Sequence, residues 1–259
     1  MPTLFALLAC AGEAAPPPDS ELFAVAHGEY YARAPEEGFE ATLLWFHGHN
    51  TAAKDSFENS ALQRVIDEHG FLVVVPVGLD ESWTVRGSPG FEGGGRDELS
   101  FIEEVLDDAE ERFGDLGFVA SGGASHGASL PYQLACETDW VDLINPIMGT
   151  FWEPMPEQCP SLPKALRHVH GTSDSTWPFE EGRELGGSKQ GDVPEALALW
   201  RRTLDCEEQS EPLEEDGISC ERWACAEGEV RLCMHPGGHS KPSGWSDRLA
   251  AWVQERMGS

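Results

Sequence analysis

Short apolar runs and longer amphipathic segments follow one another along the chain. Runs at residues 41–46, 71–76 and 117–121 are typical of buried strands in a parallel sheet. Segments with apolar residues three or four positions apart follow them, as at 55–69 and 97–113, and this spacing predicts helices with one buried face. Alternating strands and helices predict a mainly parallel, doubly wound sheet with helices on both of its faces.

The same alternation continues to the C-terminus and predicts a single domain over residues 23–259, a common length for one α/β domain. Glycine and proline residues in 77–96 predict a long loop, and the acidic, cysteine-bearing stretch 207–229 predicts a surface insertion. The remaining elements expected are strands at 22–34, 141–148, 165–169 and 230–234, and helices at 128–136, 194–204 and 245–256.

Charge excludes some classes of partner. The chain has 46 acidic and 17 basic residues and a net charge of −29. Such a surface repels phosphates, so we expect neither nucleic acid nor an anionic membrane surface as a partner. High net charge also favours solubility, which is the simplest reason for this composition. No apolar run is long enough to predict a transmembrane helix.

Residues 1–22 are predicted to be a leader and a proline-rich linker. The apolar run 4–10 ends in Leu-Leu-Ala-Cys and resembles the end of a bacterial lipoprotein signal. That resemblance implies cleavage before Cys10, a lipid anchor on Cys10, and a secreted, periplasmic or cell-envelope location. The start lacks lysine and arginine and the run is short, so a disordered N-terminus with an incidental cysteine is the alternative.

The other cysteines also favour export. Their number is even, and four of them fall within 28 residues, a pattern that suggests disulfides formed in an oxidising compartment. Zinc is the rival interpretation of the cluster, but no Cys-x-x-Cys pair is present. The six are Cys136, Cys159, Cys206, Cys220, Cys225 and Cys233.

A Gly-x-Ser-x-Gly motif at residues 123–127 lies between a predicted strand and a predicted helix. Glycines two positions before and after Ser125 permit the sharp turn that exposes a nucleophilic serine. Neither Ser121 nor Ser129 has glycines at this spacing on both sides. We therefore predict Ser125 as the nucleophile of a hydrolase.

A serine nucleophile needs a base and an acid that orients it. Asp174 follows the predicted strand 165–169, and His239 follows the last predicted strand and two glycines. The order Ser, Asp, His is that of α/β-hydrolases. His235 falls inside the last strand, so His239 is the predicted base; an ordinary turn is the alternative role of Asp174.

The oxyanion hole of such an enzyme uses backbone N–H groups. We predict the amide of His126 and, from the loop after the strand 41–46, the amide of His49. The pairs His47-x-His49 and His168-x-His170 could instead hold a metal ion. No acidic ligand motif accompanies them, so we expect neither a metal nor another cofactor. Four tryptophans in neighbouring loops either line a pocket or pack for area alone: Trp83, Trp152, Trp177 and Trp245.

Together these motifs resemble the polyhydroxybutyrate depolymerase and feruloyl esterase group of α/β-hydrolases, similar to carbohydrate esterase family 1. The resemblance runs from about residue 23 to the C-terminus. It rests on His47-Gly48, Asp97 to Ile102, Leu134-Ala135-Cys136, His170 to Asp174, Trp200 with Cys206, and Gly237-Gly238-His239. It implies the α/β-hydrolase fold. It also implies that Cys206 pairs with Cys225, leaving Cys220 with Cys233 and Cys136 with Cys159, among 15 possible connectivities.

Two departures concern the substrate. His49-Asn50 replaces the Cys-x-Gln common in this group, and residues 241–245 replace its Trp-Pro-Gly. No polymer-binding domain accompanies the chain, so degradation of crystalline polyester is not expected. The sequence predicts a monomeric serine esterase for small or oligomeric esters of the polyhydroxyalkanoate, feruloyl or acetyl type. The alternatives are a peptidase or acyltransferase with the same triad, or a catalytically dead binding lipoprotein.

Overall fold

The computed structural model describes residues 21–161 and 165–258. The predicted leader up to residue 20, including Cys10, lies outside the described residues. No helix within the described ranges combines the length and apolar character that a bilayer span requires.

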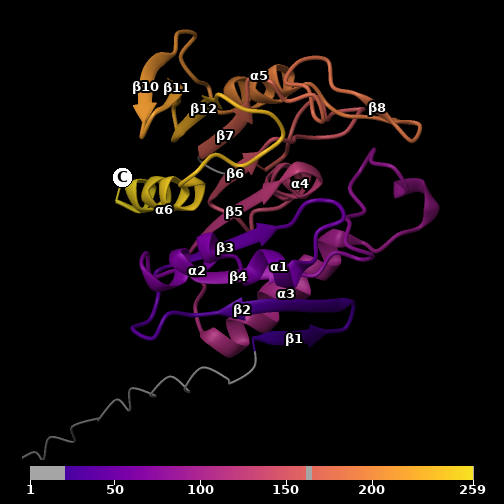
Figure 1. Cartoon of the computed structure of the whole chain (residues 1–259), viewed down its shortest axis with the longest axis vertical. Helices are drawn as coiled ribbons and strands as arrows, with labels where there is room; N and C mark the ends of the chain where they lie inside the picture. The colour runs from indigo at the N-terminus through magenta and orange to yellow at the C-terminus, as the bar shows by residue number, and fades with distance from the viewer. Residues whose placement is uncertain (1–20, 162–164, 259) are drawn as a thin grey trace, which may run out of the picture.

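A ten-stranded sheet forms the centre of the described part of the chain (Figure 1). Its strands are β1 (Leu22–Val25), β2 (Gly28–Arg33), β3 (Ala41–Phe46), β4 (Leu72–Pro76), β5 (Phe118–Ala124), β6 (Leu143–Ile147), β7 (Ala165–Gly171), β10 (Glu211–Glu215), β11 (Ile218–Ala224) and β12 (Glu229–His235). A small hairpin of β8 (Glu184–Leu185) and β9 (Ser188–Lys189) stands apart from it. The α-helices are α1 (Ala53–Phe57), α2 (Ser60–Asp67), α3 (Glu98–Phe113), α4 (Ser129–Glu137), α5 (Val193–Thr203) and α6 (Trp245–Met257).

The strand order is β1-β2-β4-β3-β5-β6-β7-β12-β11-β10. The central strands from β4 to β12 are parallel, and antiparallel strands close both edges. Parallel neighbours direct all their carboxyl ends to one edge of the sheet. The loops after β3, β5, β7 and β12 therefore meet there, as ligand-binding loops of open α/β sheets do.

Alternate residues of the buried strands enter two different cores, one on each face of the sheet. In β3, Leu44 and Phe46 pack in the core that includes α3, α4 and α5, whereas Leu43 and Trp45 pack in the core that includes α1, α2 and α6. Because both faces are covered, the parallel strands are apolar throughout, which is why they appear in the sequence as continuous runs.

Two predicted elements are each divided in the structure. The segment 22–34 is a hairpin, in which β1 and β2 pair antiparallel with Val25 opposite Gly28. The predicted helix 55–69 is α1 and α2, separated at Asn59, whose side chain accepts a hydrogen bond from the Ala61 N–H and caps the second helix. The cap divides the predicted helix and a two-residue turn divides the predicted strand. The apolar pattern continues across both divisions, so the sequence does not show them.

The stretch 207–229, predicted as a surface insertion, is strand in its greater part and not an irregular loop. This stretch forms β10 and β11, which extend the main sheet beyond β12. Its acidic residues masked the strands because they occupy exposed positions between buried ones, as in β11. The 77–96 stretch is mainly loop, as predicted, with one short 3-10 helix, η1 (Phe91–Gly93).

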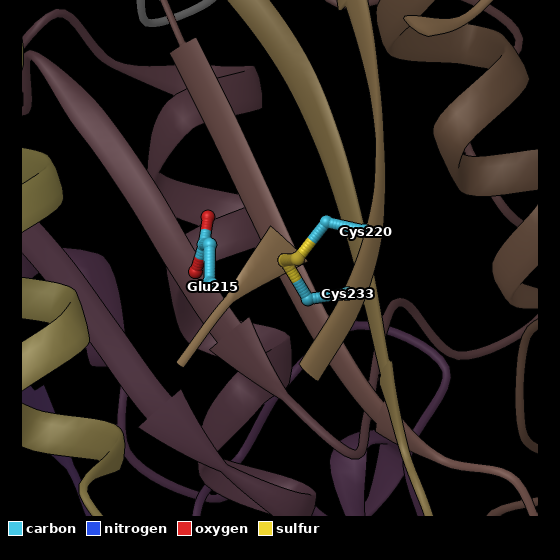
Figure 2. A group of neighbouring side chains, drawn as sticks. All are labelled: Glu215, Cys220 and Cys233. Atoms are coloured by element: carbon cyan, nitrogen blue, oxygen red, sulfur yellow. A yellow bond between two sulfur atoms is a disulfide. The ribbon is translucent and has the colours of Figure 1, made fainter. Parts of the chain in front are cut away.

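Three disulfides reinforce this framework, and they are the pairs that the family resemblance implies. Cys136–Cys159 ties the end of α4 to a loop, and Cys206–Cys225 closes the base of the β10–β11 hairpin. Cys220 and Cys233 stand directly opposite each other on β11 and β12, where Figure 2 shows their bond near Glu215. Disulfides fit an oxidising compartment.

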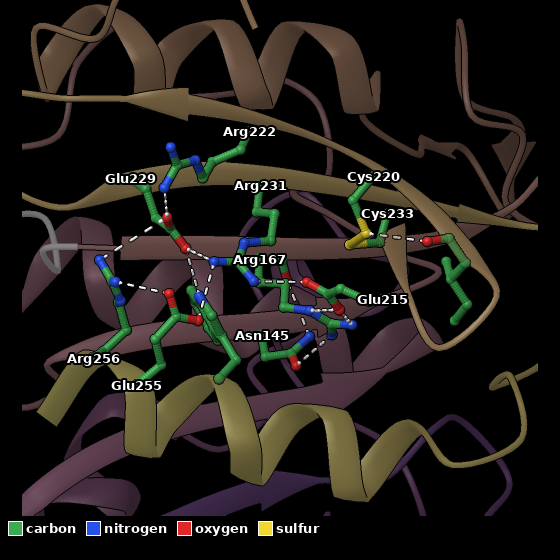
Figure 3. A network of polar contacts seen from close by, with 12 residues as sticks. Asn145, Arg167, Glu215, Cys220, Arg222, Glu229, Arg231, Cys233, Glu255 and Arg256 are labelled. Carbon is green, nitrogen blue, oxygen red and sulfur yellow. Dashed lines mark hydrogen bonds and ion pairs between the residues drawn. A yellow bond between two sulfur atoms is a disulfide. The ribbon is translucent and has the colours of Figure 1, made fainter. Parts of the chain in front are cut away.

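A buried network of charges attaches the β10 edge strand to the centre of the sheet. The Glu215 carboxylate accepts hydrogen bonds from Arg167 Nε at 3.0 Å and Arg231 Nη1 at 2.7 Å, and Arg231 also pairs with Glu229 (Figure 3). Burial would raise the pKa of Glu215, but the hydrogen bonds and charges of the two arginines outweigh burial and hold that pKa below its usual value. The carboxylate is therefore ionised at neutral pH.

Candidate active site

The predicted nucleophile lies on a tight turn between β5 and α4. Ser125 begins a 3-10 helix, η2 (Ser125–Ala128), and its φ of 56° is in the left-handed region. A Cβ at Gly123 would come 2.3 Å from the Gly127 carbonyl oxygen, and one at Gly127 would come 2.2 Å from that of His47. Both positions therefore require glycine, and the turn holds Ser125 in a conformation that few serines adopt.

Ser125, His239 and Asp174 form one continuous line of hydrogen bonds. His239 Nε2 lies 2.7 Å from Ser125 Oγ, and His239 Nδ1 lies 2.7 Å from Asp174 Oδ2. Because an ionised carboxylate only accepts hydrogen bonds, Nδ1 carries the ring proton and Nε2 presents its lone pair to the serine hydroxyl. The structure thus brings the three predicted residues together in the geometry that a general base requires.

The loop after β7 fixes the Asp174 carboxylate. Its Oδ1 accepts hydrogen bonds from the Thr176 and Trp177 N–H groups, both at 2.9 Å, which leaves Oδ2 free for His239. The side chain of Asp174 is fully buried. Asp174 is therefore a turn residue and a partner of His239 at once, so the two readings of its role are compatible.

A buried chain of hydrogen bonds positions this loop relative to α4. His170 Nε2 donates to the Trp177 carbonyl at 2.9 Å, so its Nδ1 accepts from His168 Nε2 at 3.0 Å. His168 Nδ1 in turn accepts from the Tyr132 hydroxyl at 3.0 Å. Burial lowers the pKa of both histidines, which keeps them neutral as this pattern requires.

Two backbone amides are available beside the serine. His126 is the second residue of η2, and an amide in the first turn of a helix has no acceptor within that helix. The His49 N–H has no acceptor within the described ranges, and Gly48 lies against the turn, since a Cβ on it would be 3.6 Å from Ser125 Cβ. Both predicted oxyanion donors thus lie in segments that flank Ser125.

The imidazoles of the two predicted donors share one hydroxyl. Ser82 Oγ lies 2.9 Å from His49 Nδ1 and 3.3 Å from His126 Nδ1. Burial lowers the pKa of His126 to about 4, so this ring is neutral at physiological pH. The side chains stabilise the loops that carry the amides, and sequence reasoning did not identify Ser82 because it falls within the long loop 77–96.

A cavity of about 470 Å³ opens over Ser125 and His239. Trp152 and Trp177 line it, whereas Trp83 packs against Phe46 and Trp245 against Trp45. The sequence did not identify several of the residues that face this cavity, because polar loops between elements carry no periodic signal: Pro89, Thr176, Arg183, Leu185, Gly186 and Gln190.

The histidine pairs considered as metal ligands are engaged in hydrogen bonds. His47 Nδ1 donates to the Gly48 carbonyl and Nε2 accepts from the Gly78 N–H, both at 3.0 Å. His168 and His170 belong to the buried chain described above. In the described part of the chain, three side chains lie close enough together to be considered as ligands of one metal ion, and they are Glu215, Cys220 and Cys233. Their sulfurs are joined in a disulfide (Figure 2), so they offer no thiolate to a metal.

Comparison with known proteins finds likeness in structure but not in sequence. No protein-family model and no curated protein matches the chain. An acetyl xylan esterase from Aspergillus awamori superposes with a TM-score of 0.63 at 13% identity, covering 87% of this chain and 93% of that one. A protein of Thermus thermophilus, TT1662, gives 0.59 at 20% identity, covering 92% and 98%.

A carboxylesterase from Bacillus cereus gives a TM-score of 0.57 at 15% identity, covering 89% of this chain and 95% of that one. Identities this low demonstrate a shared fold and nothing finer. The parallel centre of the sheet, the turn at Ser125 after β5 and these superpositions agree on one architecture. The chain has the α/β-hydrolase fold.

Proposed function

We propose that this protein is an exported serine esterase that hydrolyses carboxylic esters through an acyl-enzyme. One observation carries the proposal: the unbroken hydrogen-bonded line from Asp174 through His239 to Ser125, which ends at the floor of an open cavity. The fold by itself would not carry it, because the same fold hosts unrelated functions.

In the proposed mechanism, Ser125 Oγ attacks the ester carbonyl while His239 Nε2 takes the hydroxyl proton. Asp174 stabilises the imidazolium that forms and keeps the proton of Nδ1 in place. His239 then donates its new proton to the leaving alcohol, and the acyl group remains on Ser125.

Negative charge on the carbonyl oxygen is stabilised by the amides of His49 and His126, each contributing about 2.7–4 kcal/mol by analogy with other oxyanion holes. A water molecule attacks the acyl-enzyme in the second half of the reaction. His239 again serves as base, and collapse of the second intermediate releases the acid and restores Ser125.

Short acyl esters are the first substrates to test. The cavity has room for a small acyl or aromatic group beside Trp152 and Trp177, whose rings pack edge to face, and the Aspergillus awamori neighbour is named an acetyl xylan esterase. The polyhydroxyalkanoate-oligomer and feruloyl classes follow from the motif resemblance. The three disulfides support export, and lipidation at Cys10 stays a prediction from the sequence.

The test compares wild type with Ser125→Ala and a matched control, Ser173→Ala, whose exposed side chain lies one residue before Asp174. Acetyl, butyryl and feruloyl esters and a hydroxybutyrate oligomer are assayed beside short peptides and acyl acceptors. We expect ester hydrolysis by wild type and by the control, and a loss of about 10⁴-fold or more in Ser125→Ala. Equal rates in all three proteins would disprove the mechanism.

A further inference from the structure

Charge is distributed unevenly between the surface and the cavity above Ser125. Although acidic residues outnumber basic ones by 46 to 17 in the chain, no carboxylate belongs to the described residues that line this cavity. Among these described lining residues, Arg183 alone carries a permanent charge. His126, with its pKa lowered to about 4, adds no positive charge at neutral pH.

Arg183 has no protein carboxylate as a partner within the described ranges. Most other described arginines pair with one, as Arg167 and Arg231 do with Glu215. A cation left unpaired in so acidic a protein, at the edge of a substrate cavity, is available to an anion from outside.

The backbone holds Arg183 in place at the cavity. Its carbonyl accepts the Gln190 N–H at 2.9 Å, and Gly182 packs so closely on Gln190 that a Cβ there would meet the Gln190 carbonyl oxygen at 1.9 Å. Along this extended segment, residues two apart share a face, so Arg183 and Leu185 both line the cavity. The β8–β9 hairpin that follows Arg183 stands at the same side of the molecule as the loop after β4 (Figure 1).

Two residues that line this cavity also have a buried polar atom without a hydrogen-bond partner in the described part of the chain. Trp152 is 4% exposed and Gln190 is 3% exposed, and neither Trp152 Nε1 nor Gln190 Oε1 has a hydrogen-bond partner within the described residues. A buried N–H donor without an acceptor is costly.

From this arrangement we infer that the cavity selects esters that carry a carboxylate near the scissile bond, and that Arg183 is the residue that recognises it. This inference rests on the proposed esterase function and names its substrate class. The carboxylate could belong to the acyl part, as in a half-ester of a dicarboxylic acid, or to the alcohol part, as in an acylated hydroxy acid. In either case the guanidinium binds the carboxylate and takes no part in the proton transfers.

Matched pairs of substrates distinguish a carboxylate on the acyl part of the ester from one on the alcohol part. Monomethyl glutarate is compared with methyl 4-carbamoylbutanoate for the acyl side, and 4-acetoxybenzoate with 4-acetoxybenzamide for the alcohol side. We expect wild type to prefer the anion in at least one pair by roughly 10-fold to 100-fold in kcat/KM, the range of a charged hydrogen bond. The preference should weaken as salt is added.

Arg183→Gln should abolish this preference with little change on the neutral amides, and Arg183→Lys should retain part of it. Arg202→Gln on α5, an exposed arginine that lines no part of this cavity, is the matched control and should retain all of it. An unchanged preference in Arg183→Gln, or no preference in wild type, would overturn the inference while leaving the esterase proposal intact.

A binding measurement decides the inference without relying on turnover. Titration calorimetry with both anionic esters uses Ser125→Ala and the double variant Ser125→Ala/Arg183→Gln. At least one ester should bind the single variant about 10-fold or more tightly than the double variant. Equal affinities, or no binding of either anion, would overturn the inference even if no ester were hydrolysed.

Discussion

Ser125 is held in a strained conformation by its neighbours. A φ of 56° costs a non-glycine residue of the order of 1–3 kcal/mol. The turn maintains it because Gly123 packs on the carbonyl of Gly127, and Gly127 packs on that of His47, at distances no side chain tolerates. The strain therefore comes with a benefit: Oγ stands clear of the sheet and reaches His239 Nε2 at 2.7 Å.

Asp174→Asn should lower kcat by about 10³–10⁴-fold without unfolding the protein. Oδ1 of residue 174 accepts the Thr176 and Trp177 N–H groups, so an asparagine would retain its oxygen there and present its NH₂ to His239. Nδ1 of His239 would then have to accept, which places the ring proton on Nε2, where it cannot receive the serine proton.

The measurement is steady-state hydrolysis of a short-chain ester, with thermal unfolding as the check on folding. Asp97→Asn is the matched control, since Asp97 caps α3 through the Ser100 N–H and does not line the cavity. Activity in Asp174→Asn near that of the control would show that Asp174 does not set the tautomer of His239.

At the scale of elements, the sequence was informative where burial on one or both faces imposes a pattern. The apolar runs of β3, β4 and β5 and the amphipathic α3 stand at or within a few residues of their predicted positions. The Ser125 turn and the positions of Asp174 and His239 were predictable because strand ends and glycines mark them.

Other elements could not be found this way. The β8–β9 hairpin and the Arg183 position lie in polar sequence with no period. Their conformation depends on the contact of Arg183 with Gln190 and on the bridge from Gln190 to Trp152, which is distant in the chain. The edge strand β10 was missed because it is largely exposed. The strand β11 beside it was missed because charged residues occupy the exposed positions between its buried ones, so both strands resemble a loop in the sequence.

Glu215 should make the attachment of β10 dependent on pH. Its folded pKa is lower than its unfolded pKa, so the stabilisation is present above the ordinary glutamate pKa and is lost as the pH falls through the folded value. Glu215→Gln removes the ionised partner of buried Arg167 and should cost about 3–5 kcal/mol at pH 7.

Urea unfolding of wild type and Glu215→Gln at several pH values measures this effect. The difference between their free energies of unfolding should shrink as the pH is lowered through the folded pKa of Glu215. Glu207→Gln, at an exposed position before β10, serves as control and should differ little from wild type throughout. A difference that stays constant with pH would contradict the role given to the carboxylate.

For the whole molecule, the dominant physical feature is a net charge of −29. Repulsion among these charges destabilises the compact state, and salt screens it as the Debye length falls from about 10 Å at 0.1 M to about 3 Å at 1 M. The three disulfides act in the opposite direction, because each restricts the unfolded chain and typically contributes about 2–4 kcal/mol.

We therefore expect the Tm to rise as sodium chloride is increased from about 0.1 M to about 1 M. Differential scanning calorimetry measures the Tm. The Tm of the reduced protein should rise by more than that of the oxidised protein, because the reduced protein lacks the restraint of the disulfides. A Tm that falls or does not change with salt would mean that repulsion is not a significant term in stability.

The central claim is that Ser125 is the nucleophile, and covalent labelling tests it most directly. The protein is treated with a 4-nitrophenyl phosphonate ester, which traps an activated serine as a tetrahedral adduct, and the adduct is mapped by mass spectrometry of its peptides. The account predicts one adduct per chain, on Ser125, with loss of ester hydrolysis in step with its formation. An adduct on another residue, or full hydrolytic activity without any adduct, would contradict it.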